Sequence, residues 1–371
     1  MFSPSGAYKV GLTNGGDLVL QDKYSRSIWT AGVSGGYHCY MQSDGNLIVK
    51  DNNKNVKWTS HTSLNPGARL AVDDGGRIAV ISGTTALWLD GVPRGQYNGP
   101  SSNDLMFPVR GLFYYPWYPQ TWTVNGKLAH FEPDLGFYSS SDPLVAETHI
   151  DAFEYAHVDL SIASWWGPES NSDRARLTLL MDETIALNSQ VKWTVYHEKE
   201  KGADPSPAEI REDLDYLKKW FAWHPAWAHK EGRPVIFVYN EGGCEVANRW
   251  MAAANGEWYV VLKLFRGYTD CPTQPDSWHQ YGVENVGLQY KDYSYTIAPG
   301  FWRADRDTPR MPRLSESAWC QNVKGMVDSG EPWQLVVSFN EAGEGTMIEA
   351  SSAWSSDTQY GFYLDCLHKF V

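Results

Sequence analysis

The sequence lacks an excess of basic charge and any long apolar run. Its 371 residues carry 44 Asp and Glu against 31 Lys and Arg, a formal net charge of −13. Because no basic run offsets this balance, we expect neither nucleic acid nor an anionic membrane surface as a partner. No apolar stretch approaches about 18 residues, so the sequence predicts no membrane insertion.

Cysteine is scarce, at five residues, and no two form a C-x-x-C pair. We therefore expect no zinc site and predict no metal. Cys39 stands alone in the N-terminal third. For the other four, the first hypothesis is two disulfides, Cys244–Cys271 and Cys320–Cys366. Free buried thiols are an equally open alternative.

Targeting and phosphate-binding motifs are also missing. The first residues, MFSPSGAYKV, lack the apolar core of a secretory signal, and no Asn-X-Ser/Thr glycosylation acceptor occurs. A secreted location is expected without a visible signal peptide, and a cytoplasmic one stays open. Without a glycine-rich phosphate loop, we predict no cofactor.

Aromatic residues, in contrast, are abundant: 18 Trp, 21 Tyr and 13 Phe. Most of these rings will belong to the core, but sugars expose flat C–H faces that stack well on aromatic side chains. This composition favours a carbohydrate as the partner.

The first ninety residues contain a repeat. Trp29, Trp58 and Trp88 lie 29 and 30 residues apart. A glycine turn and a short alternating strand precede each one, which indicates three copies of one strand–turn–strand unit. We predict a threefold all-β domain with the tryptophans at its centre. The three turn-and-strand segments are 15–22, 44–51 and 75–82.

The middle copy, QSDGNLIVK, resembles the Q-x-D-x-N-x-V-x-Y sugar motif of the bulb-type mannose-binding lectins, a β-prism family. The resemblance implies that residues 1–95 form a β-prism whose mannose site contains Gln42, Asp44 and Asn46. Lys50 stands where that family has a tyrosine. The alternative is a degenerate lectin fold that serves as a spacer or docking module.

Residues 96–108 are rich in Gly, Pro, Ser and Asn and are predicted to be a linker. In residues 109–371, apolar strands alternate with amphipathic helices, which favours an α/β domain with a parallel sheet, a (β/α)8 barrel. The predicted helices are 139–156, 176–187 and 207–223. The eight predicted strands are 110–116, 158–166, 191–198, 234–240, 257–265, 285–290, 293–300 and 335–341.

Aromatic and acidic residues follow several of these strands. Since barrel enzymes place their sites at the carboxyl ends of the strands, these residues predict a sugar cleft. The aromatic side chains could equally belong to the barrel core, and His197 could be a buried, hydrogen-bonded histidine. The candidate substrate-binding residues are Tyr115, Trp117, Tyr118, Trp165, Trp166, His197, Glu198 and Tyr239.

The last predicted strand runs into 339-FNEAGEGTMIE-349, which contains Glu341, Glu344 and Glu349 directly after Asn340. Glycoside hydrolysis needs two carboxyl groups, one as a proton donor to the leaving oxygen and one as base or nucleophile. Neighbouring carboxylates also raise one another's pKa, which helps to keep one of them protonated. This segment is therefore the predicted catalytic centre.

Five motifs in chain order, FYYPWY, YSSSDP, SWWGP, APGF and FNEAGEGTMIE, resemble those of glycoside hydrolase family 99, the endo-α-mannosidases and endo-α-mannanases. The resemblance implies that Glu344 is the general acid. It implies that Glu341 is a base toward the sugar's own 2-hydroxyl, so that the anomeric configuration is retained. Asn340 and Glu349 would bind substrate, or Glu349 would orient the loop. Ala342 and Gly343 replace the family's aromatic residue and histidine.

Three functions follow from these patterns. The first is a retaining, endo-acting hydrolase of α-mannosidic linkages in mannan or N-glycan-type oligosaccharides, with an appended weak mannose-binding lectin. The second is a glycan-binding lectin whose barrel is catalytically inactive. The third is a related hydrolase that acts on another polysaccharide. Intact Glu341 and Glu344 favour an enzyme, and the Ala342–Gly343 pair keeps the third function open.

Overall fold

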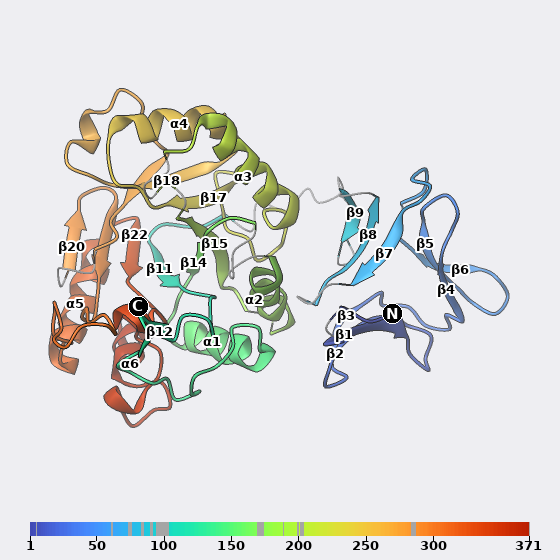
Figure 1. Ribbon diagram of the computed structural model, residues 1–371, viewed down its shortest axis with the longest axis horizontal. Coiled ribbons are helices and arrows are strands. Elements are labelled where there is room, and N and C mark those ends of the chain that lie inside the picture. Colours follow the sequence, from blue (N-terminus) through green and yellow to red (C-terminus); the bar gives the residue numbers. More distant parts are fainter. Residues whose placement is uncertain are drawn as a thin grey trace. The chain divides into compact units, whose positions relative to one another are not determined.

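The chain folds into two compact units, Met1–Pro100 and Ser101–Val371, each described by itself below (Figure 1). None of the described helices has the length and apolar character that a membrane crossing requires. The computed structural model describes residues 1–4, 6–60, 62–72, 76–82, 85–89, 92–93, 104–168, 174–187, 189–198, 200, 204–282 and 287–370.

The N-terminal unit consists of three antiparallel sheets, each built from neighbouring strands of the chain (Figure 1). The strand orders are β1-β2-β3, β4-β5-β6 and β10-β9-β8-β7. One sheet thus corresponds to one copy of the sequence repeat. The strands are β1 Tyr8–Leu12, β2 Leu18–Asp22, β3 Ser27–Thr30, β4 His38–Met41, β5 Leu47–Lys50, β6 Val56–Thr59, β7 Arg69–Val72, β8 Ile78–Ser82, β9 Thr85–Leu89 and β10 Val92–Pro93.

The three repeated tryptophans meet edge to face, as the repeat predicts. The ring centroids of Trp29 and Trp58 are 6.0 Å apart, those of Trp29 and Trp88 5.5 Å, and those of Trp58 and Trp88 5.3 Å. Such T-shaped pairs match the positive edge of one ring to the negative face of the next. The tryptophans join the three sheets through one shared apolar core.

The second unit contains eight parallel strands that form a nearly closed barrel. The first, β11, pairs with β14 on one side and with the last, β22, on the other. Between β19 and β21 the wall is joined by two bonds: Gln280 N–H donates to Ser294 Oγ (3.1 Å), and Thr296 Oγ1 donates to Gln280 O (2.7 Å). The strands are β11 Val109–Tyr114, β14 Leu160–Trp165, β15 Lys192–His197, β17 Arg233–Val238, β18 Tyr259–Lys263, β19 Ser277–His279, β21 Ser294–Ile297 and β22 Trp333–Val336.

One predicted barrel strand was wrong. Residues 285–290 were expected to form the sixth strand, but β20, Gly287–Tyr290, is an antiparallel partner of β21 at the edge of the sheet. The sixth parallel strand is β19, which pairs with β18. With three residues, β19 is too short to show a periodic apolar pattern, so no local pattern predicts it.

The helices pack in neighbouring pairs on the outside of the barrel: α1 with α2, α3 with α4, and α5 with α6 (Figure 1). Local signals fix their starts. Asp142 caps α1 and Ser206 caps α3, each followed by a proline in the first turn. The helices are α1 Pro143–Tyr155, α2 Arg174–Ala186, α3 Pro207–Trp220, α4 Cys244–Ala254, α5 Glu316–Ser329 and α6 Phe362–Lys369. The smaller elements are β12 Thr123–Val124, β13 Lys127–Leu128, β16 His229–Lys230, η2 Tyr268–Asp270, η3 Ala342–Glu344 and η4 Ser352–Trp354.

Both predicted disulfides are confirmed. Cys244 is bonded to Cys271, and Cys320 is bonded to Cys366, while Cys39 is free. Each bridge ties a helix of the barrel to a later segment of the chain. Such bonds persist in oxidising environments, so they are compatible with an extracellular protein.

The predicted linker is shorter than expected at its C-terminal end. Residues 96–103 lie outside the described part of the chain, but Leu105 is buried in the barrel core, and its N–H donates to His229 O at 2.7 Å. The ring of Phe107 lies 4.9 Å from that of Trp333. Residues 104–108 therefore belong to the barrel unit, because Leu105 and Phe107 pack near the amino ends of its strands.

Candidate active site

Glu341 and Glu344 follow β22 at the carboxyl end of the barrel. Glu341 N–H donates to Ser338 Oγ at 2.9 Å, and Glu344 ends the short 3-10 helix η3. Gly345 comes next with φ of +65°, and a Cβ there would lie 2.6 Å from Trp302 O. Only glycine fits this conformation and this contact, so Gly345 fixes the path of the acidic loop.

The carboxyl group of Glu341 lies beneath two tyrosines. Tyr281 donates to Glu341 Oε2 at 3.0 Å, and the hydroxyls of Tyr281 and Tyr115 are 2.6 Å apart. Tyr115 therefore donates to Tyr281 whenever Tyr281 donates to the carboxylate. Burial raises the pKa of both tyrosines well above 10, which keeps them protonated as donors.

A third carboxylate, Glu198, reaches the same place from the end of β15. It is 8% exposed, as is Glu341, and Ser164 Oγ donates to its Oε1 at 3.0 Å. Burial, followed by the charges of Glu344 and Glu198, raises the pKa of Glu341 well above 4.5. Glu341 therefore binds its proton more tightly than an isolated carboxylate would, as an acid–base site requires.

Two pockets open beside these carboxylates. Glu341, Glu344 and Trp117 line a pocket of about 370 Å³. Glu344 also lines a second pocket of about 720 Å³, together with Arg303 and other charged residues of the 301–310 loop. Arg303 lines the smaller pocket as well. Glu344 and Arg303 thus stand where the two pockets meet, and the two pockets together are called the cleft below.

Asn340 holds this rim together. Its Oδ1 accepts from Tyr115 N–H at 2.7 Å, and its Nδ2 donates to Tyr115 O at 3.2 Å and to Tyr138 Oη at 3.2 Å. Tyr118 is fully buried, donates to Asn340 O and accepts from Ala342 N–H at 3.1 Å. Asn340 and Tyr118 were both predicted to bind substrate, and their contacts instead support the loop that carries Glu341 and Glu344.

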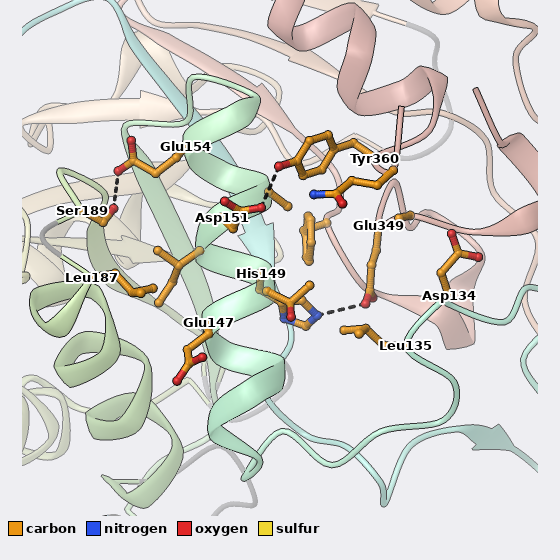
Figure 2. A pocket seen from close by; sticks show the side chains of 16 residues that line it. Asp134, Leu135, Glu147, His149, Asp151, Glu154, Leu187, Ser189, Glu349 and Tyr360 are labelled. Atoms are coloured by element: carbon orange, nitrogen blue, oxygen red, sulfur yellow. Dashed lines mark hydrogen bonds and ion pairs between the residues drawn. The ribbon is translucent and has the colours of Figure 1, made fainter. Parts of the chain in front are cut away.

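Glu349 was predicted to contact substrate or to orient the loop, and its contacts favour the second role. Its carboxylate is buried and accepts from Tyr138 Oη at 2.8 Å and from His149 Nε2 at 2.9 Å. Figure 2 shows Glu349 next to His149 of α1. The two residues line a separate pocket of about 730 Å³, whose lining includes neither Glu341 nor Glu344. Tyr114 donates to His149 Nδ1 at 2.9 Å, which leaves Nε2–H for Glu349.

Two of the residues predicted to bind substrate line neither pocket of the cleft. His197 is fully buried, and its Nε2 lies 2.9 Å from Asp213 Oδ2 on α3. Trp165 is also fully buried, with its ring near those of His197 and Tyr216. Both side chains point outward from the barrel wall to the helices. Side chains alternate between the two faces of a strand, and Trp165 and His197 occupy positions that face outward.

The remaining aromatic candidates differ from one another. Trp117 lines the smaller pocket, and its ring stacks at a tilt 4.7 Å from that of Tyr115. Tyr239 is half-buried, with Lys263 Nζ 4.2 Å above its ring. Trp166 is 42% exposed. Of these rings, Trp117 is the one that lines the same pocket as Glu341 and Glu344.

The sequence interpretation missed Tyr281 and Arg303, which both lie close to Glu341. Tyr281 follows β19, the strand that the pattern did not show, and Arg303 lies in a loop without periodicity. The APGF motif at 298–301 marks the start of that loop. A search for polar residues just after this motif would have found Arg303.

In the N-terminal unit, Asn46 serves the fold. Its Oδ1 accepts from Thr59 Oγ1 (3.0 Å), Ser60 Oγ (3.1 Å) and Thr62 N–H (3.1 Å), and the residue is buried. Asp17, 29 residues earlier, makes the corresponding bonds from Thr30 Oγ1 and Val33 N–H. The residue at this position therefore has a structural role in both repeats, and the side-chain oxygen of Asn46 is occupied by hydrogen bonds within the unit. Of the other two predicted sugar ligands, Asp44 is exposed and Gln42 partly exposed.

In the described residues of the second unit, eight parallel strands form a barrel. A pair of glutamates follows the last strand and lines a cleft that also contains aromatic residues. This is the architecture of the barrel glycoside hydrolases. The chain belongs to glycosyl hydrolase family 99, whose model matches residues 118–304, about half of the chain.

Relatives and solved structures agree with this assignment. The mouse glycoprotein endo-alpha-1,2-mannosidase is 30% identical, and the rat protein 27% identical, over 118 residues. The match covers 30% of this chain and 25% of each relative, so the chain spans about a quarter of their length. The endo-alpha-mannosidase structure from Bacteroides thetaiotaomicron is 23% identical with a TM-score of 0.57, covering 72% of this chain and 97% of that one. The structural likeness establishes the barrel fold.

The raised pKa of Glu341 leads to a prediction about stability. A carboxyl group that holds its proton more tightly in the folded chain destabilises the fold as that proton is lost, so its contribution to stability falls as pH rises from about 4.5. Glu341→Gln mimics the protonated form. The free energy of unfolding of the variant should match that of wild type near pH 4. At pH 7 it should be larger by about 1.4 kcal/mol for each unit by which the fold raises the pKa of Glu341.

Urea unfolding from about pH 4 to pH 8 measures this difference. Glu349→Gln is the matched control, because that buried carboxylate accepts two hydrogen bonds, which an amide oxygen and NH₂ group cannot both replace. The control should lose stability at pH 7. A Glu341→Gln variant that is less stable than wild type at pH 7 would show that ionised Glu341 is favoured by its surroundings.

Proposed function

We propose that the barrel hydrolyses α-mannosidic linkages within mannan or N-glycan-type oligosaccharides, as a retaining, endo-acting enzyme. The observation that carries the proposal is the cluster of Glu341 and Glu344 in a cleft beside Trp117, at the carboxyl end of the barrel. Membership of family 99 supports a glycoside hydrolase, and the endo-mannosidase names of the relatives support the substrate.

In the first step, Glu341 takes the proton of the 2-hydroxyl, and that oxygen attacks C1 of the same sugar. The C1–O bond to the leaving saccharide breaks while Glu344 donates its proton to the leaving oxygen. The product is an anhydro sugar that is not bonded to the protein. In the second step, water attacks C1 and the C1–O2 bond of the anhydro sugar breaks, while Glu344 takes a proton from the water and Glu341 returns a proton to O2. Two inversions at C1 give overall retention.

The geometry is consistent with this division of roles. Glu341 lines only the smaller pocket, and Glu344 lines both. An acid that protonates the oxygen between two sugars must reach both sides of the broken bond, which suits Glu344. A base toward the 2-hydroxyl needs to reach only one sugar, which suits Glu341. Because the two carboxyl groups interact, ionisation of one disfavours ionisation of the other, so the pair can supply one acid and one base.

The N-terminal unit is proposed to be a bulb-lectin-like β-prism that binds mannose weakly through its middle repeat. Its three antiparallel sheets around three tryptophans support the fold. Since the fold occupies the carbonyl of Asn46, Gln42 and Asp44 would supply the acceptors for sugar hydroxyls. With two disulfides in the barrel, we further propose that the protein works outside the cytoplasm.

Glu344→Gln should lower the turnover of an unactivated α-mannan oligosaccharide by at least about 10²-fold, because the positioned general acid is lost. Turnover is measured by the release of shorter oligosaccharides, with folding checked by thermal melting. Glu316→Gln, on the exposed first turn of α5, is the control and should leave turnover unchanged. Near-wild-type turnover of Glu344→Gln would remove Glu344 from the role of the acid.

The participation of the 2-hydroxyl gives a second prediction. A substrate in which hydrogen replaces this hydroxyl should bind but not react, and a 2-fluoro glycoside with a good leaving group should leave no adduct on the protein. The product of the natural substrate, followed by NMR, should keep the α configuration. A stable adduct on Glu341 in intact-mass spectra would instead make Glu341 a nucleophile.

For the N-terminal unit, we use the full chain carrying Glu344→Gln, so that the ligand is not hydrolysed. Adding Gln42→Ala and Asp44→Ala should abolish its retention on mannose resin. Thr13→Ala is the matched control, because Thr13 precedes Gln42 by one repeat of 29 residues. Equal retention of all three proteins would exclude the middle repeat as the binding site.

A further inference from the structure

The strongest unexplained feature of the cleft is the way in which two loops meet over it. One is the hairpin β12–β13, residues 123–128, which precedes α1. The other is the 301–310 loop, which follows β21. Asn125 Nδ2 donates to Asp305 Oδ2 at 2.8 Å, and Lys127 Nζ lies 3.7 Å from Asp307 Oδ1. Polar contacts thus join segments about 180 residues apart in the chain.

The 301–310 loop is itself attached to the catalytic loop. Trp302 N–H donates to Glu344 O at 2.8 Å, and Ala304 N–H donates to Gly343 O at 2.9 Å. These bonds hold the residue between them, Arg303, next to the catalytic pair. The carbonyl of Arg303 accepts from His130 Nε2 at 3.0 Å, and the His130 ring stacks 4.0 Å from that of Trp302.

Gly343 makes room for the hairpin. A Cβ at this position would lie 3.1 Å from Val124 Cγ2 and 3.8 Å from Thr121 O. A histidine here, as in the family motif, would push the hairpin away from the acidic loop. Gly343, which replaces the family's histidine, therefore allows β12–β13 to lie against the acidic loop.

The side chain of Arg303 is held by a chain of polar contacts. Its Nε donates to Asp305 Oδ1 at 3.0 Å and its Nη2 to Asp305 Oδ2 at 3.1 Å, while Asn125 donates to the same carboxylate. A bidentate arginine–carboxylate pair has a fixed geometry. The carboxylates of Asp305, Glu344 and Glu341 raise the pKa of Arg303, which places its charge near both catalytic glutamates.

We propose that Arg303, held by Asp305 and Asn125, is a specificity-determining residue that binds the leaving saccharide next to Glu344. The proposal rests on the proposed hydrolase function. It follows from the position of Arg303 where the two pockets meet, 39% exposed, with guanidinium N–H groups that can donate to sugar hydroxyls. The larger pocket, lined by arginines and aspartates of the 301–310 loop, offers donors and acceptors side by side, which suits a chain of hydroxyl groups.

The smaller pocket, with Trp117 and Glu341, then holds the sugar whose bond is cleaved. The larger pocket is about twice its volume and extends away from Glu341. The cleft thus favours substrates with a saccharide, rather than a small group, on the leaving side.

The test compares two substrates, an α-mannotetraose and an aryl α-mannobioside whose leaving group is a 4-methylumbelliferyl ring. Arg303→Ala should raise KM for the tetrasaccharide by about 10-fold or more, because a charge-assisted hydrogen bond is lost, and raise KM for the aryl substrate by less than about 3-fold. Arg303→Lys keeps the charge without the planar fork and should give an intermediate KM.

Asn125→Asp tests the support of Arg303. It places a second carboxylate against Asp305, so repulsion should separate the hairpin from the loop and raise KM for the tetrasaccharide only. Arg211→Ala is the matched control: Arg211 is 31% exposed and bonds to Glu257, away from the cleft, on α3. It should leave both KM values unchanged, and thermal melting should confirm that all variants fold.

An equal change of KM for both substrates in Arg303→Ala, or no change for either, would overturn the proposal. A fall of kcat without a rise in KM would overturn it as well, and would show that Arg303 acts by positioning Glu344. If wild type hydrolyses neither substrate, the proposed function fails. Calorimetric titration of the tetrasaccharide into wild type and Arg303→Ala then decides the role of Arg303 in binding: weaker binding by the variant supports it, and equal binding excludes it.

Discussion

The active end of the barrel depends on the side-chain amide of Asn340. In the ladder, β11 pairs with β22 only as far as Leu112 and Val336. Beyond that point, the amide of Asn340 makes two bonds to the backbone of Tyr115, as another strand would, and so extends the contact between the first and last strands. Together with the bond from Phe339 N–H to Phe113 O (2.8 Å), this contact holds the segment that precedes Glu341 against the end of β11.

The same amide connects the catalytic loop to α1. Its Nδ2 donates to Tyr138 Oη, Tyr138 donates to Glu349, and His149 on α1 donates to the other oxygen of Glu349. Every step of this chain is a buried hydrogen bond between groups that would be destabilising if left unpaired. The loop that carries Glu341 and Glu344 is therefore fixed from both sides, by the barrel and by a helix outside it.

How far the sequence predicts this arrangement varies with the residue. The glutamates after β22 could be predicted, because the end of a barrel strand determines their place. The disulfide pairing was one of two open hypotheses, because chain order alone does not determine which cysteines meet. The orientation of Trp165 and His197 could not be predicted. Strands of a parallel barrel are buried on both faces, so the apolar pattern does not show which side chains point inward. Tyr196 faces the barrel interior, and its neighbour His197 must then face α3.

Contacts between distant loops also could not be predicted from the sequence. Arg303 and Tyr281 reach Glu341 through the closure of the barrel, and Asn125 reaches Asp305 across about 180 residues. No local pattern specifies such pairs. In the N-terminal unit the opposite holds, because the repeat places three tryptophans at equivalent positions and threefold arrangement brings them together. The hydrogen bonds of the structure, and not the repeat alone, show that Asn46 has the bonding pattern of Asp17 and is part of the fold.

The charges around Glu341 determine how the site can work. Three carboxylates, Glu341, Glu344 and Glu198, interact closely enough to affect the pKa of Glu341, and two tyrosines above them stay protonated. Such groups titrate together, so a pH profile of activity would report the cluster and not one residue. Arg303 is a cation near this cluster, and the charges of Asp305, Glu344 and Glu341 raise its pKa. In the proposed mechanism, a substrate hydroxyl that enters this cluster meets a base, Glu341, that burial has made stronger. For this reason the proposed acid–base pair depends on Glu198 and the tyrosines as well as on Glu341 and Glu344.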